Sequence, residues 1–399
     1  MNLLIISALY PMPDRLGGDN RFFHLLQALV CEHKLTYLAF APDSQATQYG
    51  QDATDVYRNN LFGLGIGILP PGVRGALQGQ RYDAVFFQYY THALQWATEV
   101  RTFQPWAHVV VDNGDVAYRR LFSKADLTGD PADRAAAERI KREELTAYRS
   151  ADAILAVSKE DLDVVRIEIP DLEAYIIPNT HPIPDASSER RESCRLVFVG
   201  SFVHPPNVDG IMWFVHEVLP LVVNVISGVR VWVVGYAPTP EVLALASDYV
   251  EVVGYVPETA PYLESATISI APLRFGAGVK GKIGEAMAYR LPVVTTAVGI
   301  DGFGLTPGVN ILVGETPEEF ASHVINLLQD EHLRNNLADA GFQFVSEQFS
   351  EPAVNARVRS MMKALPRLPV KRLAFSKRLR VLWDDWMDKN VRWRLPSSR

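Results

Sequence analysis

Cysteine is scarce in this sequence of 399 residues, which contains only Cys31 and Cys194. Two cysteines without a CxxC pair exclude a disulfide framework and a structural zinc site of the usual kind. They are typical of a reducing compartment, and we expect both to be small core residues. No apolar run reaches the roughly 18 residues of a membrane-spanning helix. The apolar start MNLLIISALYP lacks a basic leader and predicts a first strand rather than a signal peptide.

Acidic residues are scarce near the C-terminus. Residues 351–399 contain 13 Lys/Arg against 4 Asp/Glu, a net charge of +9, whereas the whole chain carries −7 and residues 1–350 therefore −16. An acidic body with a basic tail argues against general nucleic-acid binding. Trp383, Trp386 and Trp393 lie among the basic residues, so the tail is a candidate contact with an anionic membrane surface. The alternative is a terminal helix packed on the first domain, which we expect for the first part of the tail.

The most informative stretch runs from residue 266 to residue 303. Its apolar first part, residues 266–273, predicts a buried strand of the parallel type. A glycine loop follows at 274–281, then helix formers at 282–290 and a short strand at 291–296. Strand, glycine loop, helix and strand together make a βαβ unit.

The glycine loop has the composition of an anion site. Gly276, Gly278 and Gly281 allow a ligand to approach the backbone closely. The N–H groups of the loop and of the helix N-terminus would then face the anion, which the helix dipole favours. A plain turn between two packed elements is the alternative. The loop is not a Walker motif, because no Gly-Lys-Ser/Thr follows it.

Charged residues beside the loop suggest which anion it binds. Lys280 and Lys282 add positive charge, and Glu285 follows Lys282 by three residues, near the same face of the helix. A diphosphate between the lysines and a ribose diol on the carboxylate describe a nucleotide diphosphate.

These residues also carry a family resemblance. The run KIGEAMAYRLPVV at 282–294 resembles the donor-site signature of GT-B glycosyltransferases of family four, "K-[IV]-x-E-A-M-A-x-x-x-P-V-V". Residues 299–303, GIDGF, resemble the "G-x-E/D-G" turn that follows it in the family. Many members carry a second glutamate where this chain has Ala277, and that glutamate contacts the donor sugar. A branch with a "G-x-G-x-[RK]-x-K" loop shares the difference, and this chain resembles that branch.

The resemblance, which covers residues 1 to about 360, implies an α/β GT-B fold. Two Rossmann-like domains would face each other across a cleft, and a C-terminal helix would cross back. We expect an acceptor domain at 1–180, a donor domain at 195–350, and the helix with the basic tail at 351–399. The linker is predicted at 178–193, which is rich in proline and serine and has no periodicity.

Further donor-site residues follow from the resemblance. Gly17 and Gly18 stand where the family places a Gly-Gly pair against the donor phosphates, although a plain turn is as good an interpretation. Gly200 and Ser201 open a loop whose amides can approach a phosphate. The turn that contains Val256 holds the nucleobase in the family. Since residues 200–207 lack the arginine and lysine common in the family, the two lysines at 280 and 282 must supply that charge.

Acceptor-side candidates follow two strands predicted at 83–88 and 108–112, at the edge of a parallel sheet where ligands bind. Family members often show "D-x-H-[DN]" where this chain has DNGD at 112–115, so Gly114 replaces the histidine. Asp112 and Asp115 remain candidates. His92 could serve instead, but a lone histidine is more often structural.

The sequence also gives local expectations. Residues 60–79 are rich in glycine and proline and predict an irregular segment. Ser158 is expected to cap a helix in a capping box with Asp161. Thr316 is expected to cap another, with Pro317 at its first position.

The function implied is a retaining glycosyltransferase in polysaccharide, lipid-linked glycan or glycoconjugate synthesis. It would transfer a sugar from a nucleotide diphosphate to a glycan, lipid-linked or protein acceptor without a cofactor or metal ion. Lys282, Lys280, Asp115 and His92 are the catalytic candidates, and the donor site adds Gly276, Gly278, Val279 and Glu285. We expect a cytoplasmic location, with peripheral contact to the inner membrane face through the tail. The alternative is a non-catalytic partner subunit of the same fold; an epimerase or phosphorylase has less support.

Overall fold

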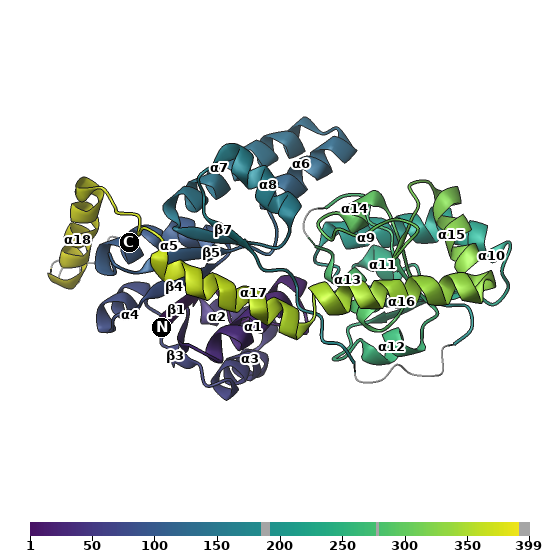
Figure 1. The fold of residues 1–399 in the computed structure, drawn as a ribbon, viewed down its shortest axis with the longest axis horizontal. Coiled ribbons are helices and arrows are strands. Elements are labelled where there is room, and N and C mark those ends of the chain that lie inside the picture. The colour runs from purple at the N-terminus through teal and green to yellow at the C-terminus, as the bar shows by residue number, and fades with distance from the viewer. Residues whose placement is uncertain (185–191, 277–278, 391–399) are drawn as a thin grey trace.

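The computed structural model describes residues 1–184, 192–276 and 279–390. The expectations for Ala277, Gly278 and Trp393 therefore lie outside the described residues. The described chain forms two α/β domains side by side, with the C-terminal helices running back along the first (Figure 1).

The first domain is built on a parallel sheet. Among the described residues its seven strands lie in the order β3-β2-β1-β4-β5-β6-β7. The strands are β1 (Asn2–Ser7), β2 (Lys34–Ala39), β3 (Gly67–Leu69), β4 (Ala84–Gln88), β5 (His108–Asp112), β6 (Ala153–Ala156) and β7 (Ala174–Ile176). Parallel strands need helical crossovers, which are α1 (Gly17–Val30), α2 (Pro42–Tyr49), α3 (Gln51–Gly63), α4 (Val73–Gly79), α5 (Tyr90–Phe103), α6 (Ala117–Thr128), α7 (Pro131–Ser150) and α8 (Lys159–Glu168).

The second domain repeats this plan. Its described strands lie in the order β10-β9-β8-β11-β12-β13. They are β8 (Arg195–Val199), β9 (Arg230–Val234), β10 (Val250–Gly254), β11 (Ile268–Ala271), β12 (Val293–Thr295) and β13 (Leu312–Val313). The helices are α9 (Pro205–Trp213), η1 (Phe214–Val218), α10 (Leu219–Val223), α11 (Pro240–Leu243), α12 (Ala260–Ser265), α13 (Gly281–Ala288), α14 (Ala297–Ile300), α15 (Pro317–Gln329) and α16 (Glu331–Gln348).

Alternation along the buried strands builds a core on each face of each sheet. In β1, Leu3 and Ile5 belong to one cluster of buried side chains, whereas Leu4 and Ile6 belong to another. Helices cover both faces of a doubly wound sheet, which is why its strands are continuous apolar runs. In both sheets the strand order reverses beside the first strand, between β1 and β4 and between β8 and β11. Ligands bind outside the carboxyl ends of the strands at such a switch point.

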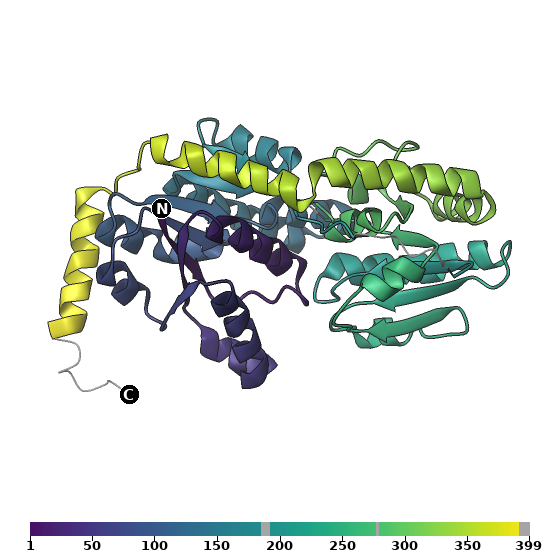
Figure 2. The same cartoon turned by 60° about the horizontal axis from the view of Figure 1, so that its bottom comes forward.

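The chain returns to the first domain after α16. The helices α16 and α17 (Glu351–Ala364) run nearly end to end along the two domains (Figure 2). Buried side chains of α17 join the core of the first domain beside α1; they are Val354, Val358, Met361 and Met362, followed by Leu365 at the start of η2 (Leu365–Arg367). The last described helix, α18 (Phe375–Asn390), lies against α5 and α4 at the far end of that domain. The tail thus begins as a packed helix.

Several local expectations can now be compared with the structure. The irregular segment predicted at 60–79 is wrong, because strand β3 and helix α4 form there despite the glycines. Cys31 is exposed at the end of α1 and is not a core residue. The Thr316 capping box is present. Ser158 caps α8 as expected, but Asp161 binds Arg119 instead of completing the box.

The packing of α17 can be tested by a core truncation. Met361 is 1% exposed in the core of the first domain. Met361→Ala should lower the free energy of unfolding by about 2–5 kcal/mol, because the lost contacts leave a cavity. Lys363→Ala, at an exposed position of the same helix, should change it by less than about 0.5 kcal/mol. Equal thermal unfolding of the two variants in calorimetry would contradict this packing.

Candidate active site

The candidate site lies at the switch point of the second sheet. The loop after β8 leads into α9, and the loop after β11 leads into α13. These two loops contain the predicted donor residues of the second domain except Val256 and Glu285. Val256 lies in the turn after β10, and Glu285 lies on α13.

Lys282 reaches from α13 across to the loop after β8. Its ammonium donates a hydrogen bond to Oδ1 of Asn207 and lies 4.2 Å from the ring centroid of Phe198. Burial lowers the pKa of Lys282 to about 7; the nearby charge of Lys280 adds to this effect and Glu285 opposes it. The amine is therefore held in place but poorly solvated.

Lys280 stands at the N-cap of α13 and is 9% exposed. Burial lowers its pKa to about 8, while the carboxylates of Asp301, Asp161 and Asp115 act in the opposite direction. Two ammonium groups that are out of water and close to a helix N-terminus favour an anion beside them. An anion beside them would stabilise the ammonium forms and so raise the pKa of both lysines.

Glu285 is fixed on the same helix. Its Oε1 accepts a hydrogen bond from the hydroxyl of Thr259 at the start of α12. Burial raises the pKa of Glu285, which Thr259 and Lys282 partly offset. The carboxylate thus has a set position about one helical turn after Lys282.

Two glycines allow the loops to approach the lysines. A Cβ at Gly200 would lie 2.8 Å from Nζ of Lys282 and 3.0 Å from the Asn207 side chain. Gly276 has φ = +149°, which an L side chain rarely adopts. Its N–H donates to Oγ of Ser123 on α6 at 3.3 Å, so the donor loop touches the first domain. Near Gly200, the buried hydroxyl of Ser201 has no hydrogen-bond partner among the described residues. A buried polar atom of this kind points to a ligand or water.

Two further donor predictions have plain surroundings. The carbonyl of Val279 accepts a hydrogen bond from Nδ2 of Asn179 at 3.4 Å, in the segment between the domains. Val256 is half-buried after Tyr255 and packs at the margin of the core that contains α13. The second domain therefore brings Val279 close to the lysine helix, whereas Val256 approaches it from the neighbouring turn.

The first domain contributes a compact surface at the ends of β1, β4 and β5. Gly17 and Gly18 begin α1, and a Cβ at Gly18 would lie 3.0 Å from the hydroxyl of Tyr89. A Cβ at Gly114 would lie 3.8 Å from Cα of Gly18. Tyr89 itself has φ = 71°, a conformation that is costly for an aromatic residue and is common at functional sites. The Gly17–Gly18 turn and the loop that contains Gly114 thus meet beside Tyr89.

Asp115 faces the second domain. Its Oδ2 accepts from Nε of Arg120 at 2.6 Å. Across from it is His204, in the loop after β8. Burial lowers the pKa of His204 most strongly; the charges of Arg120 and Lys282 lower it further, and that of Asp115 raises it. Asp115 therefore lies opposite the lysines, where an acceptor group could meet the donor.

Asp112 and His92 have structural surroundings. Asp112 forms a buried ion pair with Arg21, 2.7 Å between Oδ1 and Nη1, so its side chain is not open to an acceptor. His92 packs edge-on against Phe40, with ring centroids 5.1 Å apart. Burial lowers the pKa of His92 to about 4, so it is neutral near pH 7. His92 remains a prediction as a base, but its place is an aromatic cluster.

The two domains touch across the site through charged and aromatic side chains. Arg119 of α6 binds Asp161 of α8 at 2.8 Å and Asp301 of the second domain at 2.6 Å. Asp14, after β1, accepts from the Tyr255 hydroxyl at 2.7 Å. The guanidinium of Arg15 lies near four tyrosine rings from both domains, those of Tyr49, Tyr57, Tyr236 and Tyr255. These contacts fix the positions of the two facing surfaces relative to each other.

Sequence reasoning missed the residues that support the lysines and the glutamate. Asn207 lies 75 positions before Lys282, and Thr259 lies 26 positions before Glu285. No local spacing links such pairs.

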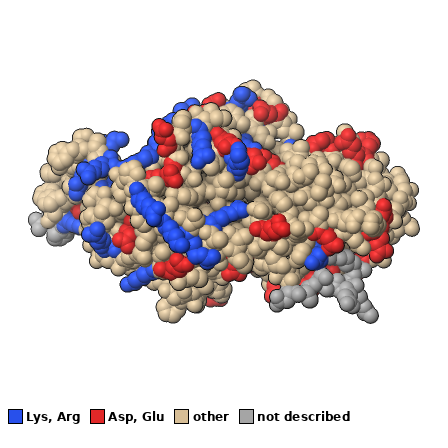
Figure 3. All heavy atoms as spheres, viewed as in Figure 1, with Lys and Arg blue, Asp and Glu red and all other residues tan. Residues whose placement is uncertain are grey.

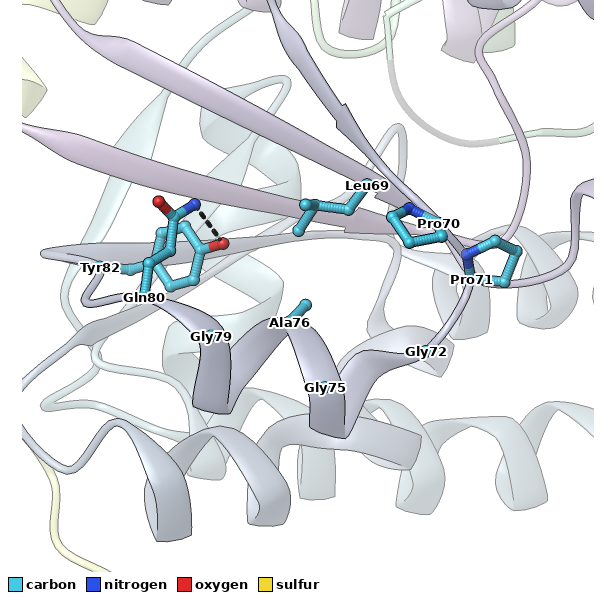
Figure 4. A pocket seen from close by; sticks show the side chains of 9 residues that line it. All are labelled: Leu69, Pro70, Pro71, Gly72, Gly75, Ala76, Gly79, Gln80 and Tyr82. Atoms are coloured by element: carbon cyan, nitrogen blue, oxygen red, sulfur yellow. Dashed lines mark hydrogen bonds between the residues drawn. The ribbon is translucent and has the colours of Figure 1, made fainter.

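Metal-binding groups and pockets bear on which other ligands the protein could hold. Within residues 1–184, 192–276 and 279–390, no three His, Cys, Asp or Glu side chains are grouped to hold a metal ion. A pocket of about 410 Å³ lies elsewhere, between α4 and the edge of the first sheet (Figure 4). Its apolar lining includes Leu69, Pro70 and Ala76 and none of the predicted site residues.

A family model and a curated relative match parts of this chain. The family model described as Glycosyl transferases group 1 matches residues 193–330, which include the lysines and Glu285. An uncharacterized 44.6 kDa protein in the cps region of Klebsiella pneumoniae is 28% identical over 214 residues, 51% of this chain and 54% of the relative. The chain thus spans about half the length of the curated relative it matches.

Solved structures resemble nearly the whole chain. HepE of Anabaena, in complex with UDP-glucose, has a TM-score of 0.66 at 15% identity, over 92% of this chain and 100% of that one. Sucrose-phosphate synthase of Thermosynechococcus elongatus has a TM-score of 0.65 at 14% identity. The likeness covers 91% of this chain and 98% of that one. TarM of S. aureus, in complex with UDP, has a TM-score of 0.59 at 14% identity, over 72% of this chain and 57% of that one. The fold is GT-B. The predicted fold class is confirmed.

Gly200 offers a direct test of the site geometry. In Gly200→Ala the new methyl group would displace Lys282 and Asn207, so affinity for UDP or another nucleotide diphosphate should fall about tenfold, equivalent to one or two hydrogen bonds. Gly63→Ala is the matched control, because a Cβ at Gly63 on α3 meets nothing within 4 Å. Calorimetric titration would measure both. Unchanged binding by Gly200→Ala would contradict the placement of Lys282.

Proposed function

We propose that this protein is a glycosyltransferase that moves a sugar from a nucleotide diphosphate to an acceptor hydroxyl. The main support is the pair of poorly solvated lysines beside Glu285 at the switch point of the second sheet. The match of that domain to Glycosyl transferases group 1 supports the same function. We infer that the donor binds on the second domain and the acceptor on the first.

The donor diphosphate would bind between Lys280, Lys282 and the N-terminus of α13. The amides at Gly200 and Ser201 would approach it from the other loop, and Glu285 would accept hydrogen bonds from the ribose diol. HepE and TarM were solved with UDP, so uridine donors are the first to test. The branch with a "G-x-G-x-[RK]-x-K" loop would recognise the sugar without a glutamate at position 277.

The proposed transfer retains the anomeric configuration. The bond between the anomeric carbon and the phosphate oxygen breaks, and the acceptor oxygen bonds to the same face of that carbon. The acceptor proton passes to an oxygen of the leaving diphosphate, so no protein nucleophile is needed. The lysines stabilise the growing phosphate charge, which is electrostatic catalysis by a preorganised site. Since they supply this charge, we propose that transfer requires no metal ion.

The acceptor would meet the donor beside Asp115 and the Gly17–Gly18 turn. Asp115, held by Arg120 at 2.6 Å, would orient the acceptor hydroxyl by hydrogen bonding. A glycan, lipid-linked or protein acceptor fits this proposal, within polysaccharide, lipid-linked glycan or glycoconjugate synthesis. We propose a cytoplasmic location. In the part of the chain that the structure describes, no helix has the length and apolarity needed to cross a bilayer.

A second candidate is a non-catalytic partner subunit that binds a nucleotide or a glycan. It is favoured by Ala277 in place of the sugar-contacting glutamate and by the absence of arginine and lysine from residues 200–207. Slow hydrolysis of a bound nucleotide sugar would support the enzyme, because a binding subunit has no reason to stabilise the leaving diphosphate.

The roles of Lys282 and Glu285 are separable by kinetics. Lys282→Ala should lower turnover about a hundredfold or more, roughly 3 kcal/mol, because the ammonium acts most strongly on the charge of the transition state. Glu285→Ala should mainly raise KM, and Glu285→Gln should do less harm because it keeps one acceptor. Lys280→Ala should fall between them.

The matched control is Lys34→Ala, since that lysine is exposed at the amino end of β2, whereas the site lies at the carboxyl ends of the strands. Steady-state kinetics with the nucleotide sugar that stabilises the protein most in a thermal-shift screen would measure all variants. If Lys282→Ala and Glu285→Ala both bind donor and turn it over like the parent, the loop and helix at 274–290 are only a structural turn. That result would contradict the proposed function.

Donor affinity should depend on pH. The pKa values of Lys282 and Lys280 are about 7 and about 8 in the free protein. The diphosphate of a nucleotide sugar binds the ammonium forms, so affinity should fall as the pH rises through this window and the free protein loses those protons. From about pH 6.5 to 8.5 we expect at least a tenfold loss in calorimetry, with proton uptake on binding.

Lys282→Arg is the control for this pH dependence, because arginine keeps its charge throughout the range. Its affinity should vary less with pH than that of the parent. An affinity that stays constant or rises with pH in the parent would contradict the proposed lysine contacts.

A further inference from the structure

Helix α18 presents an apolar side to solvent. Its exposed large side chains are spaced at intervals of three and four residues, or adjacent, and therefore lie on one side of the helix. They are Phe375 (75% exposed), Leu379 (49%), Leu382 (39%), Trp383 (61%) and Trp386 (49%). The two tryptophan rings stack with their centroids 5.3 Å apart. Large apolar side chains gathered in this way mark an interaction surface.

The polar side of α18 faces the protein. Asp388 binds Arg74 of α4 at 2.8 Å, and Asp385 accepts from Gln78 of α4 at 3.1 Å. Val381 lies on the side of the helix that faces the protein and is 9% exposed. The helix therefore packs on its domain through ion pairs and hydrogen bonds, and its apolar side is turned outward.

Basic residues surround the outward side. Arg372, Lys377, Arg378 and Arg380 are exposed in and just before α18, whereas the ammonium of Lys371 donates to the carbonyl of Arg149. Asp385 and Asp388 are engaged with α4 and Asp384 is half-buried, whereas the charged residues in the first half of the helix are all basic. Blue side chains also gather over the first domain beside α18, whereas red ones predominate on the second domain (Figure 3).

We propose that α18 docks the protein on an anionic lipid bilayer. An amphipathic helix with tryptophan and leucine on one side and Lys/Arg beside them lies in the plane of the membrane interface. Tryptophan suits this depth because its ring is apolar and its N–H is polar. A second copy of the chain fits less well, since pairing two such helices would bring their arginines together.

The place of α18 is compatible with docking. The helix stands at the end of the first domain, away from the second domain in both ribbon views (Figures 1 and 2). A bilayer at that end would leave the cleft between the domains accessible. The proposal does not depend on the catalytic function, because vesicle binding can be measured without donor or acceptor.

The test is co-sedimentation of the full chain with vesicles of phosphatidylglycerol and phosphatidylcholine in equal parts. We expect binding at low salt that weakens as salt is added. Trp383→Ser with Trp386→Ser should lower the partition coefficient roughly tenfold or more, because two large apolar groups no longer enter the interface. Phe62→Ser is the matched control, since Phe62 is 72% exposed on α3, and it should bind like the parent.

A second variant, Arg378→Glu with Arg380→Glu, keeps the apolar side and should lose the preference for anionic over pure phosphatidylcholine vesicles. Far-UV circular dichroism and thermal unfolding would show that both variants remain folded. Absence of vesicle binding by the parent at low salt would overturn the proposal, and so would parental binding by the tryptophan variant. A dimer that the tryptophan variant loses, without vesicle binding, would identify a contact between copies instead.

Discussion

The burial of two lysines at the N-terminus of α13 is the constraint on which the site depends. Removing an ammonium group from water is costly in free energy. Burial therefore lowers the pKa of Lys282 to about 7 and that of Lys280 to about 8. Protein groups compensate only in part, through Asn207 and through carboxylates near Lys280. A bound diphosphate would supply the missing charge, so the loops are preorganised for a ligand at some expense to the free protein.

The second domain alone does not make the proposed site, because the proposed acceptor residues belong to the first. The chain crosses between domains near residue 177 and again after α16, and α17 joins the core beside α1. Arg119 and Tyr255 form polar contacts across the cleft. Together these connections place Asp115 and Arg120 opposite the lysines. Loosening them would change the distance between Asp115 and the two lysines without altering either half of the proposed site.

The sequence predicted what depends on local pattern. The apolar strands, the glycine loop and the pair Lys282 and Glu285 on one helix follow from spacing, and the resemblance extended them to the GT-B fold. The residue partners do not: Asn207 and Thr259 reach α13 only through tertiary folding. Likewise, nothing near Asp112 indicated that Arg21 would pair with it.

The most direct measurement is a crystal structure of the protein with an intact nucleotide sugar. The account predicts the diphosphate within hydrogen-bond distance of Nζ of Lys282 and at the N-terminus of α13, with the ribose hydroxyls on the carboxylate of Glu285. The sugar should then point toward Asp115 on the first domain. A nucleotide bound elsewhere, or one bound here with its diphosphate turned away from both lysines, would contradict the central claim.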